Sequence, residues 1–200
     1  FNCISRIYPV DSGEIYYANN RLDLLPPHKI ARLGIGRSFQ LTRTLDHLSV
    51  TENLALHTAG GFGSHLLQRG VTINDKQRAD EIMEFLGISA LADLDMGSLS
   101  YGQKKLLDLG AVLMADPALI LLDEPAAGVN LRLLENIIDK LVTLKEQGKT
   151  ILLVEHNMDV VMGVSDDVIV MSAGQIIATG NPSEIQNNPD VLEAYLGRNT

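Results

Sequence analysis

The feature that most constrains the fold of this chain is an apolar run, Ala118–Leu122, that ends in two consecutive acids, Asp123 and Glu124. An unbroken apolar run of this length is typical of a strand covered on both faces, as in parallel sheets. Ligands of open α/β sheets bind beyond the carboxyl ends of the strands, where the two acids would lie. Adjacent side chains on a strand point in different directions, so the two carboxylates can have different roles. A strand that merely leaves the sheet into a polar loop would show the same pattern, so the pair alone does not establish a site.

The rest of the chain alternates as an α/β sheet requires. An amphipathic helix over Leu131–Gln147 precedes a second apolar strand, Thr150–Val154, which we also expect to be buried. A hairpin over residues 167–179 follows. Residues 48–109 have helical periodicity instead, and Phe1–Ile7 predicts the last part of a helix. The pattern therefore predicts an α/β fold, with a mostly parallel sheet and an inserted helical block.

Size and charge exclude several classes of protein. The 200 residues fit one domain, or one core with an inserted subdomain. A formal charge of −9, with five Tyr, four Phe and no Trp, argues against a nucleic-acid partner. Cys3 is the only cysteine, so no intramolecular disulfide is possible. No apolar run approaches the roughly 20 residues of a membrane-spanning helix, so we expect any membrane association to be peripheral.

The start of one predicted helix combines capping and anion-binding features. Ser100 and Gln103 have the S-x-x-Q spacing of a capping box, at the head of an apolar helix that runs to Met114. Gly102 would let another backbone or an anion approach this helix start. Capping alone explains the spacing equally well, so a functional role needs support from the rest of the chain.

Two single residues stand at the ends of predicted strands. His156 comes two residues after the strand Thr150–Val154, and a neutral imidazole there can contact a terminal phosphate. Gln40 closes a predicted strand that begins at Ile35. A lone His or Gln at a strand end is more often structural than catalytic.

The order of these features is more informative than any one of them. Gln40, Leu99–Gln103, the pair Asp123-Glu124 and His156 resemble, in sequence, the Q-loop, signature, Walker B strand and switch histidine of ABC ATPases. This resemblance implies the ABC cassette version of the P-loop NTPase fold, a parallel-sheet core with an inserted α-helical subdomain. It implies three regions: a core of residues 1–47 and 110–180, a helical signature subdomain of residues 48–109, and a helical tail of residues 181–200.

The resemblance also implies the chemistry, which is hydrolysis of ATP with Mg²⁺. Asp123 and Gln40 would help bind Mg²⁺, and Glu124 would activate the attacking water. His156 would contact the γ-phosphate. In this family two cassettes close head to tail, so a second ATPase subunit would be a partner. The nucleotide-binding residues would be Gln40, Ser100, Gly102, Gln103 and Asn130.

Other segments indicate the branch of the family. Glu124–Asn130, Val154–Met158 and Val191–Gly197 look like the ATPase subunits of branched-chain amino-acid importers. Cassettes for urea or short-chain amide import and for lipopolysaccharide export are close relatives and remain alternatives. Tyr101 stands where many ABC proteins have Gly, and Asn130 where most have Asp. Both departures occur within this branch.

A P-loop of the form G-x-x-x-x-G-K-[ST] is absent from the sequence. Gly148-Lys149-Thr150 imitates its end, but Thr143 occupies the first Gly position, and the triplet lies between a helix and a strand in the reverse order. In the family, a segment similar to Phe1–Ile4 follows the P-loop almost at once. We therefore expect the P-loop to precede Phe1, and the 200 residues alone to bind ATP poorly and to be inactive.

Transporters of this family imply further partners. Membrane permease subunits would bind the cassette at the cytoplasmic face of a bacterial or archaeal inner or plasma membrane. The segment Leu41–Asn53 would receive a short permease helix, with contacts expected at Leu45, Leu48 and Val50, and Gln40 would link the nucleotide state to transport. A soluble ABC ATPase of DNA repair or translation is a rival, but residues 62–76 are too short for the long coiled coils of the repair type, and the translation type usually carries two cassettes. A second rival is a non-catalytic assembly or regulatory module, although the retained Glu124 and His156 count against it.

Overall fold

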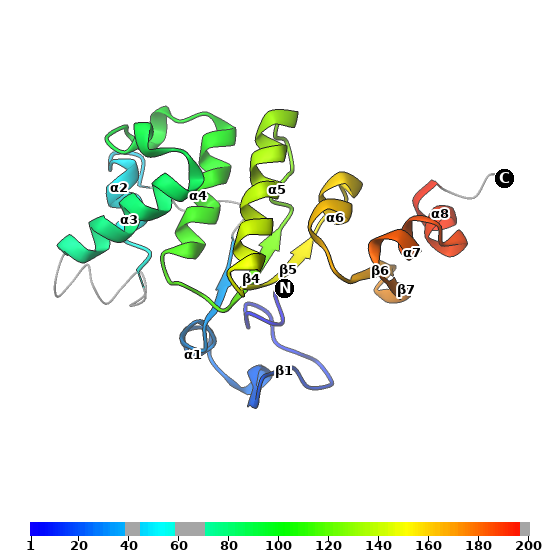
Figure 1. Cartoon of the computed structure of the whole chain (residues 1–200). Coiled ribbons are helices and arrows are strands. Elements are labelled where there is room, and N and C mark those ends of the chain that lie inside the picture. The colour runs from blue at the N-terminus through cyan, green and yellow to red at the C-terminus, as the bar shows by residue number, and fades with distance from the viewer. Residues whose placement is uncertain (39–44, 59–70, 197–200) are drawn as a thin grey trace. The chain divides into compact units, whose positions relative to one another are not determined.

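The computed structural model describes residues 1–38, 45–58 and 71–196, and the chain divides into two compact units between Val154 and Glu155. The first unit contains a parallel three-stranded sheet in the order β3-β4-β5. Its strands are β3 (Ile35–Arg37), β4 (Leu119–Asp123) and β5 (Thr150–Val154). The predicted α/β fold with a parallel sheet is confirmed (Figure 1). The three sequence regions proposed from the resemblance stay a prediction.

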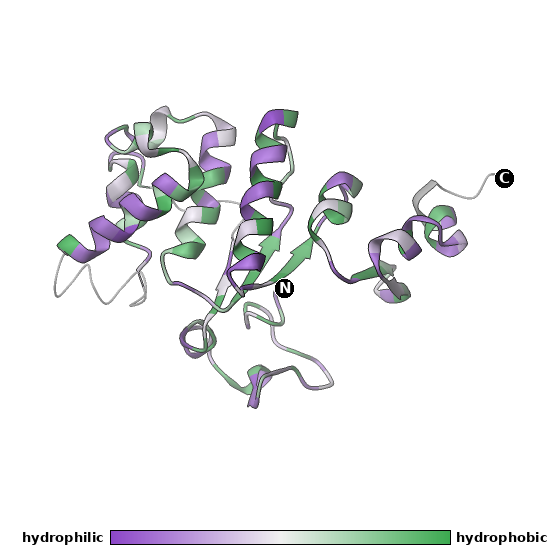
Figure 2. Cartoon of the chain, in the orientation of Figure 1, coloured by the Kyte–Doolittle hydropathy of each residue, from purple (hydrophilic) through white to green (hydrophobic). Residues whose placement is uncertain are grey.

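The central strand β4 is buried as its apolar sequence requires. Ile120, Leu121 and Leu122 are each at most 1% exposed, and β4 is coloured as hydrophobic in Figure 2. Helix α5 (Leu131–Glu146) is amphipathic, and its buried face consists of Leu134, Ile137, Leu141 and Leu144. The left-handed Gly148 follows the helix, as expected for a residue without a Cβ that ends a helix. Lys149 and Thr150 then lead into β5, so the Gly-Lys-Thr triplet lies after a helix and before a strand, as predicted.

The prediction that β5 is buried on both faces is wrong within the described residues. Its burial alternates along the strand, and Leu152 and Val154 are 40% and 46% exposed. The physical reason is position: β5 is the edge strand of the described sheet, whereas β4 is paired on both sides. Apolar content alone does not distinguish a central strand from an edge strand.

The helical block packs through a close approach at Gly110. The block contains α2 (Val50–Ala55), α3 (Ile73–Leu86), η2 (Ser89–Leu91), η3 (Met96–Ser98) and α4 (Tyr101–Leu113). A Cβ on Gly110 would lie 3.0–3.3 Å from side-chain atoms of Leu54, Ile82 and Leu86, which belong to α2 and α3. The glycine therefore lets α4 pack closely against both helices, which lie beside it in Figure 1.

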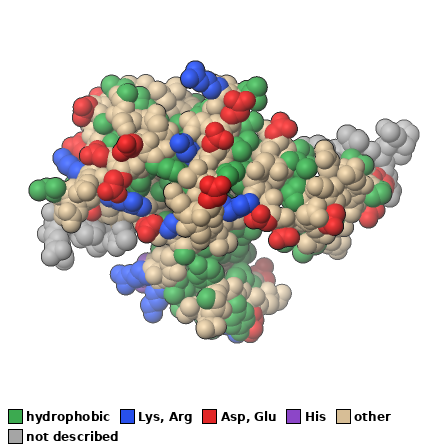
Figure 3. All heavy atoms as spheres, viewed as in Figure 1, with side chains coloured by type: hydrophobic (Ala, Val, Ile, Leu, Met, Phe, Trp, Pro, Cys, Tyr) green, Lys and Arg blue, Asp and Glu red, His purple; other side chains and the backbone are tan. Residues whose placement is uncertain are grey.

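An acidic residue links this block to the sheet. Asp116, in the turn between α4 and β4, pairs with Lys149 at 2.7 Å and with Arg78 of α3 at 3.7 Å. The turn, the helix α3 and the start of β5 are thereby held together. On the face of the first unit seen in Figure 3, acidic and basic side chains are interspersed.

The N-terminal segment has the predicted geometry of a helix end, reduced to a single turn. The Ser5 amide donates to the Phe1 carbonyl at 2.9 Å, as in an α-helix. The Arg6 amide then donates to the Cys3 carbonyl at 3.2 Å and the Ile7 amide to the Asn2 carbonyl at 2.9 Å, and Arg6 has a left-handed φ of 57°. This pair of bonds around a left-handed residue is the Schellman motif that ends helices. Further elements follow: β1 (Tyr16–Tyr17), β2 (Asn20–Arg21), η1 (Leu22–Leu24) and α1 (Pro27–Arg32).

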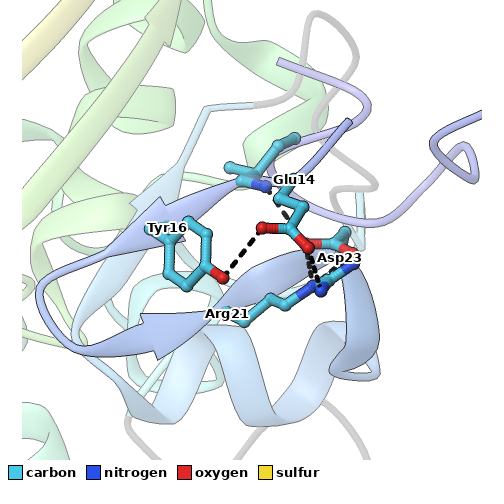
Figure 4. Close-up of polar contacts among 5 residues, drawn as sticks. Glu14, Tyr16, Arg21 and Asp23 are labelled. Carbon is cyan, nitrogen blue, oxygen red and sulfur yellow. Dashed lines mark hydrogen bonds and ion pairs between the residues drawn. The ribbon is translucent and has the colours of Figure 1, made fainter. Parts of the chain in front are cut away.

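A polar cluster closes the β1–β2 hairpin (Figure 4). Arg21 Nε donates to both carboxylate oxygens of Asp23, at 3.1 and 2.9 Å, and Arg21 also pairs with Glu14. The Tyr16 hydroxyl donates to Glu14 at 3.0 Å, and the Ile15 amide donates to Asp23 Oδ1 at 3.0 Å. Asp23 is only 8% exposed, so its carboxylate is the buried member of the cluster. These bonds join the two strands of a hairpin too short to be stable alone.

The second unit contains α6 (Met158–Val164), the antiparallel strands β6 (Val168–Ser172) and β7 (Gln175–Gly180), α7 (Pro182–Gln186) and α8 (Pro189–Leu196). Ala173 and Gly174 connect β6 to β7 with φ values of 48° and 80°. Positive φ at both loop residues is typical of the type I′ turn, whose twist matches that of a hairpin. The predicted hairpin is confirmed.

We predict that Asp23→Asn destabilises the first unit in a pH-dependent way. The hydrogen bond from the Ile15 amide, followed by the bond from Arg21, lowers the pKa of Asp23, although burial opposes the shift. A lowered folded-state pKa means that the stabilisation is complete above about pH 4, the ordinary Asp range, and is lost as pH falls through the folded pKa. The substitution should lower Tm at pH 7, and the gap to wild type should close in acid, as followed by circular dichroism. The matched control Glu14→Gln, at the exposed partner of the same arginine, should change Tm little.

Candidate functional site

The acid pair lies where β4 leaves the sheet. Asp123 is the last residue of β4 and is paired with Val154 of β5. The Glu124 amide donates to the Val154 carbonyl at 2.9 Å, and Glu124 itself has a left-handed φ of 47°. Left-handed backbone is unfavourable for a residue with a Cβ, and such strain is often found at functional sites. The chain therefore turns sharply at Glu124, immediately beyond the sheet edge.

The end of β3 supplies polar partners for Asp123. The Ser38 hydroxyl accepts a hydrogen bond from the Asp123 amide at 3.2 Å, and Arg37 Nη2 lies 3.9 Å from the carboxylate. Arg37 is itself held by Asn2 and Ser5, and its guanidinium lies 5.8 Å from the centre of the Phe1 ring. Sequence reasoning missed Arg37 and Ser38. The available signal was that neighbouring parallel strands end at the same edge.

The predicted capping box at the start of α4 is present. Ser100 Oγ accepts from the Gln103 amide at 3.3 Å, and Gln103 Oε1 accepts from the Ser100 amide at 2.8 Å. Gly102 allows close packing, because a Cβ there would lie 2.5 Å from a methyl carbon of Leu133 on α5. The helix start therefore lies directly against α5.

A cavity of about 620 Å³ lies between the start of α4, the turn after β4 and the start of α5. Four of the predicted nucleotide-binding residues line it together: Ser100, Gly102, Gln103 and Asn130. Arg132 adds a basic side chain that the sequence analysis did not single out. Asn130 also caps α5, because its Oδ1 accepts from the Leu133 amide at 3.0 Å.

The turn after β4 contacts the start of α4 directly. Lys105 Nζ donates to the Glu124 carbonyl at 3.2 Å, and the Tyr101 hydroxyl donates to the Ala127 carbonyl at 3.3 Å. Sequence reasoning missed Lys105 and gave Tyr101 no role. These contacts join residues 19 and 26 positions apart in the sequence, which no local pattern indicates.

Two of the predicted site residues are not among the described residues of the first unit. Gln40 is outside the described residues. His156 belongs to the second unit, where its amide donates to Glu155 Oε2 at 3.1 Å, and the same oxygen accepts from the Asn157 amide at 3.3 Å.

The described residues can supply only part of the ligands of a Mg²⁺ ion, so phosphate and water oxygens would have to supply the rest. Among the described residues, no group of three or more His, Cys, Asp or Glu side chains could hold a metal ion. Mg²⁺ commonly takes one or two protein carboxylates and completes its octahedron with water and phosphate oxygens. Asp123, whose side chain is 30% exposed at the sheet edge, can supply such a carboxylate.

Comparison with known proteins identifies the family of the chain. The ABC transporter family profile matches residues 1–127, and that of the branched-chain amino acid ATP-binding cassette transporter matches residues 175–199. The chain is 37% identical over 202 residues to the probable branched-chain amino acid transport ATP-binding protein LivG of Archaeoglobus fulgidus, covering 98% of this chain and 78% of that protein. It is 34% identical over 206 residues to the high-affinity branched-chain amino acid transport ATP-binding protein BraF of Pseudomonas aeruginosa, covering 98% and 81%.

Solved structures give the same result. A nucleotide-free ATP-binding cassette from an ABC transporter superposes with a TM-score of 0.86 at 35% identity, covering 98% of this chain and 82% of that one. The ADP conformation of an ATP-binding cassette gives 0.82 at 32% identity, with the same coverage. The fold is that of an ATP-binding cassette, a class of P-loop NTPase. The chain belongs to the ABC transporter family, as the motif order predicted. No helix among the described residues is long and apolar enough to cross a membrane.

We predict that Asp108→Asn, within α4, stabilises the protein at neutral pH. Burial raises the pKa of Asp108 to about 6, against a smaller opposing effect of Lys105. Within the described residues its Oδ1 is shielded from solvent and has no hydrogen-bond partner. Since the folded-state pKa exceeds the unfolded one, stability falls as pH rises from about 4 to 6, and the penalty is complete above that range.

The substitution should therefore add about 1–2 kcal/mol at pH 7.5 and progressively less toward pH 4.5, as measured by urea unfolding. The control Asp80→Asn, at an exposed position of α3, should show no such trend. A constant effect of Asp108→Asn across this pH range would contradict the burial of an ionised carboxylate.

Proposed function

We propose that this chain is the ATP-hydrolysing subunit of an importer for branched-chain amino acids. The relatives at 34–37% identity are described as branched-chain amino acid transport ATP-binding proteins, and a family profile of the same description matches residues 175–199. The observation that carries the catalytic part is the acid pair at the end of β4, beyond a strand that is paired on both sides. That position is where open α/β sheets bind their ligands.

Each site residue then has a defined task. Bound ATP supplies the phosphoryl group, and Mg²⁺ neutralises the charge that develops on it. Asp123 would hold the metal through water, with Gln40 assisting. Glu124 would orient the attacking water and accept its proton. His156 would donate a hydrogen bond to the γ-phosphate.

The residues that line the cavity would contact the nucleotide bound by a second subunit. Ser100, Gly102 and Gln103 begin a helix, and helix starts attract anions. In a head-to-tail dimer these residues and Asn130 would close on the nucleotide held by the partner cassette. The dimer would bind membrane permease subunits at the cytoplasmic face of the membrane.

The exposure of individual residues limits which of them could contact a permease. Leu45 is 42% exposed, whereas Val50 is fully buried, so Val50 cannot face a partner as the sequence analysis expected. Asn53 fixes the segment from inside: its amide donates to the carbonyls of Leu45, Leu48 and Ser49, and its Oδ1 accepts from the Leu45 amide. An exposed Leu on a segment held by these bonds can contact a partner helix.

We predict that Glu124→Gln slows ATP hydrolysis by the complete subunit about 10²–10⁴-fold, the usual contribution of a general base. ATP binding should persist, because the change removes a proton acceptor and keeps the shape of the side chain. Phosphate release and equilibrium binding of ATP measure the two effects. Glu135→Gln, at an exposed acid of α5, is the control. Near-normal turnover of Glu124→Gln would remove the base role from this residue.

We also predict that Leu45→Asp weakens assembly with the permease at least about tenfold, because a charge would be placed in an apolar contact. Co-purification of the transporter complex measures assembly, and ATPase activity of the isolated subunit should stay close to wild type. Ile73→Asp, at an 85% exposed residue of α3, is the matched control. Equal assembly of both variants would place the permease contact elsewhere.

A further inference from the structure

The carbonyl of Glu124 is held by a side chain of the neighbouring helix. It accepts hydrogen bonds from Lys105 Nζ at 3.2 Å and from the Ala127 amide at 3.2 Å. Glu124 has the left-handed φ of 47° described above. A left-handed residue with a Cβ stays in place only when its surroundings hold it there. The charged donor from α4 is part of what holds this turn.

Tyr101 makes a second contact one turn of α4 earlier. Its hydroxyl donates to the Ala127 carbonyl, and its ring covers Gly128, where a Cβ would meet a ring carbon at 3.1 Å. Gly128 has a φ of 71°, so both its conformation and its space favour glycine. Lys105 Nζ lies 5.8 Å from the centre of the Tyr101 ring, within the range of a cation–π contact. Lys105 and Tyr101 thus contact each other, and both contact the turn after β4.

We propose that Lys105 and Tyr101 are positioning residues, which fasten the turn Glu124–Gly128 to the start of α4. The inference rests on the proposed function, in which Glu124 acts on the nucleotide of its own subunit and Ser100 on that of the partner. Because of these contacts, the Glu124 carboxylate and the start of α4 would move together. A shift of α4 on contact with the partner's nucleotide would be transmitted to the backbone of Glu124.

A general packing role is a poor alternative explanation. Tyr101 is 57% exposed, so its removal takes little apolar surface out of the core. The lysine contact is a single charge-assisted bond to one carbonyl, and such a bond acts mainly on the position of that carbonyl. The two residues should therefore affect local order and turnover more than global stability.

The first test measures the turn itself, in the complete subunit without nucleotide. Lys105→Met removes the donor but keeps an aliphatic side chain, Lys105→Arg keeps a donor, and Tyr101→Phe removes only the hydroxyl. Amide hydrogen exchange of residues 124–130 should rise about 3- to 10-fold in Lys105→Met, the effect expected when one net hydrogen bond is lost. Tyr101→Phe should also raise it, and Lys105→Arg should restore most of the protection. Lys104→Met, at the adjacent lysine of α4, is the control.

The second test is kinetic. The same Lys105→Met subunit should lose about tenfold in kcat, with KM for ATP within about twofold, because a positioning residue acts on the transition state rather than on binding. Unchanged exchange in both Lys105→Met and Tyr101→Phe would overturn the proposal, as would faster exchange with unchanged kcat. If exchange and kcat both respond to Lys105→Met but Glu124→Gln keeps its turnover, the turn is fastened as proposed and the assignment of Glu124 as the base is what fails.

Discussion

The structure depends on the burial of β4 between two parallel neighbours. Ile120, Leu121 and Leu122 are almost completely enclosed, and pairing on both edges fixes where the strand ends. A slip of one residue would move every side chain of the strand to the opposite face, so the apolar residues determine the register. The positions of Asp123 and Glu124 follow from that register. The polar site is thus positioned mainly by residues that take no part in its chemistry.

At the start of α4, the structural and the functional roles use different atoms. The capping box uses Ser100 Oγ and Gln103 Oε1 as acceptors. The hydroxyl hydrogen of Ser100 and the side-chain NH₂ hydrogens of Gln103 are donors that the capping box does not use. Both residues line the cavity beside the turn. Phosphate oxygens are acceptors, so a capped helix start of this composition can still present donors to an anion. Capping and nucleotide recognition are therefore compatible rather than competing explanations of the S-x-x-Q spacing.

Sequence reasoning was most accurate where a local pattern determines the structure. The strand before Asp123, the capping box at Ser100 and the two-residue turn at Ala173-Gly174 each depend on neighbouring residues, and each was found. The prediction that β5 is buried was wrong. Val154 is as apolar as a residue of a central strand, and it is exposed because β5 lies at the edge of the described sheet. The helix end predicted for Phe1–Ile7 is present, but the left-handed backbone of Arg6 that closes it could not be foreseen, since Arg does not favour positive φ.

The site residues divide in the same way. Glu124 was identified as the end of a strand, but its left-handed backbone could not be foreseen, since a Glu is not a residue that favours positive φ. The contact between Lys105 and the Glu124 carbonyl joins two elements through tertiary packing, and no periodicity encodes it. The Arg37–Asp123 pair likewise requires the order of the strands, which the sequence did not provide.

The two departures from the general family pattern at the cavity are explained by their surroundings. Tyr101, where many ABC proteins have Gly, spans the gap to the turn and covers Gly128. A Cβ at residue 128 would lie 3.1 Å from a ring carbon, so the ring would have to shift to admit it, and the left-handed φ of 71° at this residue independently favours glycine. Asn130, where most have Asp, still caps α5, because an amide oxygen accepts the Leu133 amide as a carboxylate would. The exchange removes one negative charge from a cavity that would face phosphate, and like-charge repulsion there is reduced accordingly.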